Sequence, residues 1–445
     1  MKPSPRGVDP VRVPYLNHHL KEDTPMSMRK VLAMVIALAI VISMVPMALA
    51  EDKAVVTIWH TFTNEQEAYL IKAAEDFTAS QDKYEVRVES QAYSGFTDTV
   101  KTAVKSGVGP DIIFNYASEA AEYVDLGLVA DLSQYIYSDE NGIEGFDDCL
   151  PQGVMDGEVL GCSDGVIHYL PAYTTGPILF YNKTLYTELN LTVPTTWDEM
   201  VANCRVIKEQ KGIPGLGFDS LTDCIQMFIM DDGNGYIDVA NKCVSFDTDT
   251  MRARIQWFVD CVNEGLFLIA PSGNYFSNDF NSGVVATYVG SCAGYPYITP
   301  DGFEFDMAPM PANDWYPSWN RGPIVFYYQD DARAEGAYEF VKYFISADMN
   351  LGWVKVCNAL SPYTWTQALE GYQAFLAEET PAVSALKAVE ARLNIAGSLP
   401  AVTGASTVRN EIVNAVKNVV NNGMTVDEAW TLCVTNCNTA LQGAK

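Results

Sequence analysis

The chain is poor in histidine and in the short motifs of common enzyme active sites. It has 4 histidines among 445 residues, and only His60 and His168 follow the N-terminal apolar run. This scarcity excludes a histidine-rich metal site and argues against a Ser-His-Asp triad. The sequence has no phosphate-cradling glycine loop, no G-x-S-x-G elbow and no H-E-x-x-H pair. The acidic run 231–235 has glycine where calcium loops need oxygen ligands, so it is interpreted as a turn.

Basic residues are also scarce. The chain has 28 Lys and Arg against 56 Asp and Glu, a formal net charge of −28. A field of this sign repels nucleic acid and anionic membrane surfaces, so neither is expected as a partner. The same field repels anionic solutes, so an anionic ligand is less expected than a neutral one.

A single long apolar run lies near the N-terminus. A basic pair at 29–30 precedes the run at 31–45, and the small residues Ala48 and Ala50 follow. This order is typical of a secretory signal peptide cleaved after Ala50, with Met28 as the expected true start. A membrane anchor would need about 20 apolar residues, more than the run supplies. The cleavage point has no cysteine, so no lipoprotein attachment is expected.

The cysteines allow disulfides but do not indicate a metal site. All 10 follow the apolar run, and an even number in an exported chain permits pairing. None forms the C-x-x-C pairs of a zinc site. Cys433 and Cys437 are one helical turn apart, where a bridge would constrain little, and the sequence leaves the pairing open.

The first part of the chain after the apolar run alternates between two periodicities. Strand patterns at 55–60, 84–90 and 110–114 alternate with helical patterns at 65–80 and 97–106. This order predicts a parallel sheet with crossover helices, an α/β fold. About 395 residues follow the predicted cleavage point, enough for two domains.

Residues 171–200, PAYTTGPILFYNKTLYTELNLTVPTTWDEM, are the most informative stretch. An apolar strand stops at Asn182, and Thr196 stands before an acidic first helical turn at 197–199, which is an N-terminal cap signature. The strand, the Y-N-K turn and the P-x-T-W-D-E helix start together resemble the central signature of extracellular solute-binding proteins. The resemblance is to the sugar-binding, maltose-binding-like class, which serves ABC importers.

Further segments resemble the same family in the same order. They are 126–132, 280–290, 321–346, 353–362 and 408–430. The resemblance covers residues 54–440 and implies a two-lobed, periplasmic-binding-protein-like α/β fold of type II. Each lobe would be a sheet flanked by helices, and the chain would cross between the lobes at three hinges.

The resemblance also implies domain boundaries. It places the crossings near 170–172, 285–286 and 322–324. After a leader of residues 1–50, the first lobe would contain 51–170 and 287–322, and the second 173–284 and 325–445. Short crossing strands of this kind act as hinges for lobe closure around a ligand.

Ligands of open α/β sheets bind beyond the C-terminal strand ends, and the residues expected there are strongly aromatic. Flat aromatic rings suit the apolar face of a sugar, and hydroxyl and amide groups suit its polar rim. Trp315 belongs to the same aromatic segment as Trp319. The residues expected at the ligand are His60, Phe96, Tyr116, Tyr173, Thr175, Ser291, Tyr295, Trp319, Gly322 and Tyr327.

Arg409 points to a second ligand class. The segments 58–65 and 170–183 and the arginine of the terminal helix resemble the glycerol-3-phosphate-binding branch in particular. In that branch an arginine at the matching position clamps the phosphate, so Arg409 is also expected at the ligand. The chain departs from the branch at Phe96, where a tyrosine is expected, near Ala117, where an acidic residue is expected, and at its G-Y-x-P turn.

The resemblance therefore implies an exported binding protein rather than an enzyme. It would close on a neutral sugar or oligosaccharide without cofactor or metal, and deliver this carbohydrate ligand, as a monomer, to the permease subunits of an ABC transporter. The alternative ligand is glycerol-3-phosphate or a glycerophosphodiester. A remoter alternative is a secreted glycoside hydrolase, because pairs of acidic residues are abundant.

Overall fold

The structure is a computed structural model that describes residues 53–443 except 93–94, 162–163, 220, 270–275 and 313. The predicted leader and its cleavage site at Ala50 lie outside the described residues. Within the described part, no helix combines the length and the apolar character needed to cross a membrane. Nine cysteines of this part carry free thiols.

The first sheet has five strands in the order β2-β1-β3-β13-β4. Strands β1, β2 and β3 are parallel, as the strand–helix alternation predicts. Strand β13 returns antiparallel to β3 and continues antiparallel to β4. The strands are β1 (Ala54–His60), β2 (Tyr84–Ser90), β3 (Ile112–Asn115), β4 (Tyr173–Thr175) and β13 (Trp319–Val325).

Helices cover both faces of the first sheet. Alternate residues of β3 belong to different cores: Ile112 and Phe114 pack with α2, α12 and α13, and Ile113 packs with α3 and α4. The elements of this first group are α2 (Asn64–Ser80), α3 (Phe96–Lys105), α4 (Ala117–Val124), α5 (Ser133–Ile136), η1 (Phe146–Asp148), α6 (Gln152–Val154), η2 (Met155–Val159), α12 (Asp331–Phe344), α13 (Ala347–Cys357) and α14 (Thr364–Gln367).

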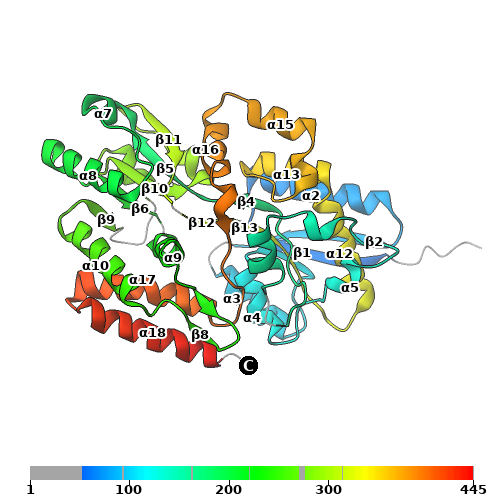
Figure 1. Ribbon diagram of the computed structural model, residues 1–445. Coiled ribbons are helices and arrows are strands. Elements are labelled where there is room, and N and C mark those ends of the chain that lie inside the picture. Colours follow the sequence, from blue (N-terminus) through cyan, green and yellow to red (C-terminus); the bar gives the residue numbers. More distant parts are fainter. Residues whose placement is uncertain are drawn as a thin grey trace, which may run out of the picture. The chain divides into compact units, whose positions relative to one another are not determined.

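The second sheet has the order β11-β5-β10-β6-β9 and mixes parallel with antiparallel pairs. Its strands are β5 (Pro177–Asn182), β6 (Leu216–Phe218), β9 (Phe267–Ile269), β10 (Thr287–Ser291) and β11 (Phe305–Pro309). Figure 1 shows α7, α8, α10, α17 and α18 gathered around this sheet. The result is a two-lobed α/β fold built on two mixed sheets.

The second group holds the remaining helices and two small ladders. Its helices are α7 (Lys183–Glu188), α8 (Trp197–Lys211), α9 (Leu221–Asp231), α10 (Asp249–Asn263), α11 (Ser277–Asn281), η3 (Cys292–Tyr297), α15 (Glu370–Ala377), α16 (Pro381–Glu390), η4 (Leu393–Ile395), α17 (Ala405–Asn422) and α18 (Val426–Gly443). The ladders pair β7 (Ile237–Asp238) with β8 (Cys243–Val244) and β12 (Tyr316–Pro317) with β14 (Ala396–Gly397).

Sheet membership differs from the division that the sequence implied. Residues 287–322 were expected with the first sheet, but β10 and β11 both hydrogen-bond to β5 in the second. Helices α12 and α13 were expected with the second lobe, but their apolar faces share a core with β1. The reason is that Val285 and Ala286 lie inside the second core, so the chain stays there until β13.

The predicted helix start at Thr196 is confirmed. The Thr196 hydroxyl accepts a hydrogen bond from the Glu199 backbone N–H at 3.2 Å, and Glu199 Oε2 accepts one from Thr196 N at 3.3 Å. This reciprocal pair is a capping box, which satisfies two backbone donors at the start of α8.

The middle of β13 runs very close to the chain that leads into β4. A Cβ atom added to Gly322 would overlap the Leu170 carbonyl oxygen and lie 2.8 Å from the Pro171 Cα. Both neighbours are backbone atoms of a buried segment, so they cannot move aside cheaply. Only glycine fits at this position.

We expect Gly322→Ala to lower the free energy of unfolding by about 1–3 kcal/mol or more, because the added methyl group forces β13 away from its neighbour. Urea unfolding followed by tryptophan fluorescence measures the change. The control is Gly294→Ala, whose added Cβ meets no atom within 4 Å. Equal stability of the two variants would contradict the close approach at Gly322.

Candidate functional site

A cavity of about 620 Å³ is lined by residues from both groups of elements. Its volume lies within the range of about 300–1,000 Å³ that is usual for small-molecule sites. The first group supplies Tyr116, Glu119, Glu158, Tyr173 and Thr175; the second supplies Asp219, Asp223, Gln226, Ser291 and Arg409; the stretch around β12 and β13 and the chain after β14 supply Trp315, Ser318, Trp319, Asn320 and Ser398.

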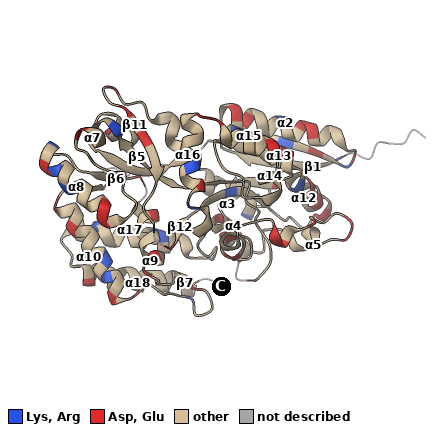
Figure 2. Cartoon of the chain, turned by 45° about the horizontal axis from the view of Figure 1, so that its top comes forward, with Lys and Arg blue, Asp and Glu red and all other residues tan. Residues whose placement is uncertain are grey.

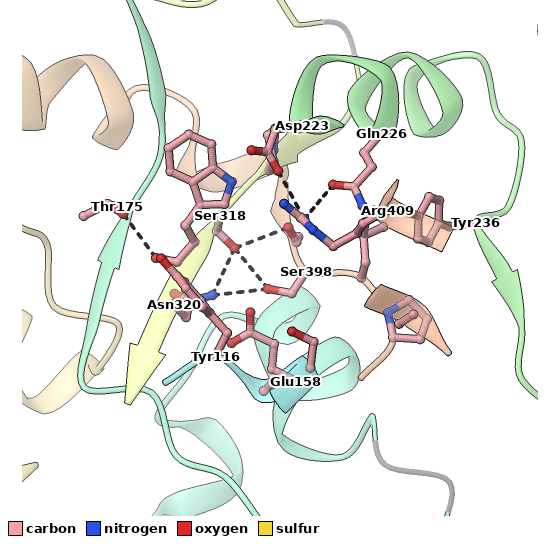
Figure 3. Close-up of a pocket in the computed structure, with 18 of the residues that line it drawn as sticks. Tyr116, Glu158, Thr175, Asp223, Gln226, Tyr236, Ser318, Asn320, Ser398 and Arg409 are labelled. Atoms are coloured by element: carbon pink, nitrogen blue, oxygen red, sulfur yellow. Dashed lines mark hydrogen bonds and ion pairs between the residues drawn. The ribbon is translucent and has the colours of Figure 1, made fainter. Parts of the chain in front are cut away.

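An uncharged hydrogen-bond network centres on Asn320 of β13. Its side-chain oxygen accepts from Thr174 Oγ1 at 2.6 Å, and its Nδ2 donates to the hydroxyls of Ser318 and Ser398, each at 3.2 Å. Asn320 is fully buried, so these bonds fix its amide and hold both serines at the cavity wall. Figure 3 shows this network beneath the second-group residues.

The cavity's arginine is held by its own neighbours. Arg409 Nη1 donates to Gln226 Oε1 at 3.0 Å and lies 3.3 Å from Asp223 Oδ1. Gln226 in turn donates to the Tyr236 hydroxyl at 2.7 Å, which fixes the amide orientation. The Asp223 carboxylate therefore offsets the guanidinium charge, and Figure 3 shows Asp223 and Gln226 directed at the Arg409 head group.

The remaining carboxyl groups of the cavity resist ionisation. Burial raises the pKa of Glu158 to about 8, opposed in part by Ser398 and Asn320. Burial also raises the pKa of Asp219 to about 6, although the Phe276 backbone N–H donates to its Oδ1 at 2.6 Å. Glu158 is thus mainly protonated at neutral pH, and the cavity carries less negative charge than its acidic residues suggest.

Aromatic rings line the cavity on both sides. Tyr116, directly before α4, is 47% exposed. Tyr173, Trp315 and Trp319 are partly buried. The Trp319 Nε1–H is buried and has no hydrogen-bond acceptor among the described residues. Rings and uncharged hydrogen-bonding groups together suit a ligand with apolar faces and a polar rim.

The structure brings together six of the eleven residues that the sequence singled out. Lining the cavity are Tyr116, Tyr173, Thr175, Ser291, Trp319 and Arg409. They come from five separate segments of the chain, so their convergence follows from the pairing of β13 with β3 and β4 and from the position of α17.

The other five do not line this cavity. His60 is buried because β1 continues through it, and its Nδ1 accepts from Phe62 N at 3.1 Å. Phe96 belongs to the core under α3 and α4, and Tyr295 packs on the second core. Gly322 lies against the backbone before β4, and the Tyr327 hydroxyl donates to Asp331 at 2.8 Å.

Sequence reasoning missed most of the polar lining. Asn320 adjoins Trp319 and the predicted crossing, so its neighbourhood was a usable signal. Asp223 and Gln226 sit three residues apart on α9, where a polar pair inside an apolar helix could have been noticed. Glu158 lies in the short π-helical turn η2, which has no recognisable sequence pattern. The described residues contain no group of three or more His, Cys, Asp or Glu that could hold a metal ion.

Comparisons with known proteins agree on one class. A family model described as bacterial extracellular solute-binding protein matches residues 72–375. The multiple sugar-binding protein of Streptococcus mutans is 29% identical over 166 residues, 37% of this chain and 36% of that relative. The match therefore spans only about a third of the relative's length.

Solved structures share the fold. The cyclic alpha-maltosyl-1,6-maltose binding protein of Arthrobacter globiformis has a TM-score of 0.75 at 22% identity, covering 88% of this chain and 99% of that one. The GacH receptor of Streptomyces glaucescens has 0.71 at 22%, covering 89% and 100%. MalE of Xanthomonas citri has 0.72 at 18%, covering 87% and 98%.

The raised pKa of Glu158 predicts that the stability difference between the wild type and Glu158→Gln depends on pH. Above the ordinary pKa near 4.5 the unfolded chain loses the Glu158 proton, whereas the folded chain keeps it up to a pKa of about 8. The folded state therefore binds more protons, and its stability falls as pH rises through this window. We expect Glu158→Gln to exceed the wild type by a few kcal/mol at pH 8 and to match it below pH 4.5.

Urea unfolding from pH 4 to 9 measures this difference. The control is Asp156→Asn, an exposed carboxylate on the same helical turn. A difference between Glu158→Gln and the wild type that stays constant across the pH range would show that Glu158 titrates normally.

Proposed function

Because the chain belongs to the family of bacterial extracellular solute-binding proteins, we propose that it captures a neutral sugar or oligosaccharide in the cavity and delivers it to an ABC importer. The family consists of solute-binding proteins rather than enzymes. The observation that carries the proposal is the lining itself: aromatic rings on both sides of the uncharged Asn320 network. A sugar ring presents C–H faces to the former and hydroxyls to the latter.

The names of the relatives support the carbohydrate class. One is named for multiple sugars and another for a cyclic maltosyl-maltose. The structure of the GacH receptor was determined with acarbose and an acarbose homologue. These proteins differ in the length and shape of their ligands, so the proposal for this chain stays at the class of neutral, hydroxyl-rich carbohydrates.

Lobe closure supplies the mechanism. We propose a first lobe of residues 53–175 and 319–367 and a second of 177–317 and 370–443, divided by sheet and core membership. The cavity takes its lining from both lobes. A ligand that contacts both walls stabilises the closed form by its differential affinity for that form, and the closed form is what a permease would recognise.

Glycerol-3-phosphate has less support. Arg409 is half-exposed at the cavity, as a phosphate anchor should be, but Asp223 already offsets its charge. The net charge of the chain is −28, and a field of this sign repels an anion. Figure 2 shows acidic positions spread over the helices of the described chain. A dianionic ligand would have to overcome this field with one partly neutralised cation.

An extracytoplasmic location follows from the family. The finer picture is proposed from the sequence: a signal peptide cleaved after Ala50, no lipid attachment, and a monomer that docks on membrane permease subunits. The mass of the protein recovered from the extracytoplasmic fraction of expressing cells should correspond to a chain that begins at Glu51. A mass that retains residues 31–45 would indicate an anchor instead.

We expect a neutral oligosaccharide to raise the melting midpoint of residues 51–445. The panel contains maltotriose, raffinose, cellobiose and glucose, together with glycerol-3-phosphate. A ligand at 100 times its dissociation constant stabilises the folded state by about 2.7 kcal/mol, which shifts the midpoint by several degrees. A shift with glycerol-3-phosphate alone, abolished by Arg409→Ala, would instead establish the phosphate ligand.

Tyr116 is expected to contribute an aromatic face to the bound sugar. We expect Tyr116→Ala to weaken binding of the tightest sugar of the panel about tenfold, because ring stacking and apolar contact are lost together. The matched control is Tyr137→Ala, since Tyr137 is similarly exposed at 55% but lies outside the cavity. Isothermal titration calorimetry compares the two, and equal affinities would remove Tyr116 from the site.

A further inference from the structure

Glu158 reaches the cavity from an unusual backbone segment. It lies on η2, a single π-helical turn, and such turns are rare and occur frequently at functional sites. The turn is fixed against the chain after β14: a Cβ added to Gly157 would lie 2.5 Å from the Ser398 carbonyl oxygen. The position of the Glu158 carboxyl relative to Ser398 is therefore set by backbone packing.

One oxygen of this carboxyl has no partner. Glu158 is 8% exposed, and its Oε2 is buried without a hydrogen-bond partner among the described residues. A buried polar atom that stays unsatisfied costs about 1–3 kcal/mol, so native proteins rarely keep one without a reason. Because Glu158 lines the cavity, a bound molecule can supply the missing partner.

We propose that the Glu158 carboxyl contacts the bound sugar directly and donates a hydrogen bond to one of its oxygens. This inference rests on the proposed function, because it requires the cavity to hold a carbohydrate. It makes Glu158 a specificity-determining residue of the cavity floor, opposite the charged wall formed by Arg409 and Asp223. Figure 3 shows its side chain beside Ser398 and below the Asn320 network.

The surroundings of Glu158 favour the neutral acid as donor. The side chains that oppose the rise in its pKa are those of Ser398 and Asn320, both uncharged. Helix α4, which packs against η2, presents acidic Glu119 and Glu122, and η2 itself adds the exposed Asp156. Tyr169, whose hydroxyl donates to the Asn320 backbone oxygen, has its pKa raised far above neutrality and stays uncharged. No basic side chain of the described residues is among the groups that lower the pKa of Glu158, and burial therefore favours its neutral form.

A protonated carboxyl selects a particular feature of carbohydrates. Ring and linkage oxygens carry no hydrogen and can only accept, so an ionised carboxylate would leave them unpaired. A carboxylic acid donates to them through its O–H. Hydroxyl oxygens can accept the same bond. The cavity floor thus suits a neutral glycan with an acceptor oxygen directed at Glu158.

Three variants test the contact by calorimetric titration at pH 7 with the panel sugar that binds the wild type tightest. We expect Glu158→Ala to weaken binding about tenfold, because the donor is lost. Glu158→Gln keeps a donor in the same place and is expected to stay within about threefold of the wild type. Asp156→Ala, on the same turn but exposed, is expected to bind like the wild type. Melting of each variant without sugar confirms folding.

Titration from pH 6 to 9.5 tests the donor role. We expect the affinity of the wild type to fall above pH 8 as the proton is lost, and that of Glu158→Gln to stay level. Wild-type affinity that rises above pH 8, or an unchanged affinity of Glu158→Ala, would overturn the inference while leaving the proposed function intact. A folded wild type that binds no sugar of the panel would contradict the proposed function itself.

Discussion

The fold and the cavity both depend on the pairing of β13. This strand hydrogen-bonds to β3 over Gly322–Val325 and to β4 over Trp319–Arg321, so one continuous strand joins β3 to β4 in the first sheet. Its first residues carry Trp319 and Asn320 into the cavity. Because Gly322 allows backbone contact with residues 170–172, the strand cannot shift without disturbing β4. The formation of the first sheet therefore sets the positions of Trp319 and Asn320 in the cavity.

Charge explains why a neutral ligand fits this site better than a charged one. The Arg409 guanidinium is shared between Gln226 and Asp223, which leaves little of its field for an anion. Burial raises the pKa of Asp219 and Glu158, so these groups resist carrying an uncompensated charge. What remains are hydroxyls, amides and a protonated acid, which together match a polyol and exchange hydrogen bonds with it rather than ion pairs.

The sequence predicted the elements better than their assembly. The strand–helix alternation over 55–114 and the Thr196 cap were read from local pattern, because periodicity and capping depend on neighbouring residues. Local pattern did not predict which sheet would receive β10 and β11, or which core would receive α12 and α13. That placement depends on contacts with residues far away in the sequence. Six residues of the cavity lining were expected from the sequence, among them the aromatic residues Tyr116, Tyr173 and Trp319. Glu158 and Ser398 were not expected at the cavity. Glu158 lies in a π-helical turn and Ser398 in an irregular segment, and neither has a periodic sequence pattern.

Two of the hydrogen bonds that join the two walls lie between α4 and the chain at the start of α17. Across the cavity rim, Ser406 of α17 donates to Glu122 of α4 at 3.3 Å, and Thr403 donates to the Ala121 carbonyl at 3.2 Å. Both bonds are part-buried, and a typical hydrogen bond contributes only about 0.5–1.5 kcal/mol net, because it replaces bonds to water. A bound sugar that reaches both Asn320 and Asp223 adds contacts that exist only when the walls are close. In the proposed function, ligand contacts with both walls add free energy in favour of the closed form, and this difference would let a permease distinguish loaded from empty protein.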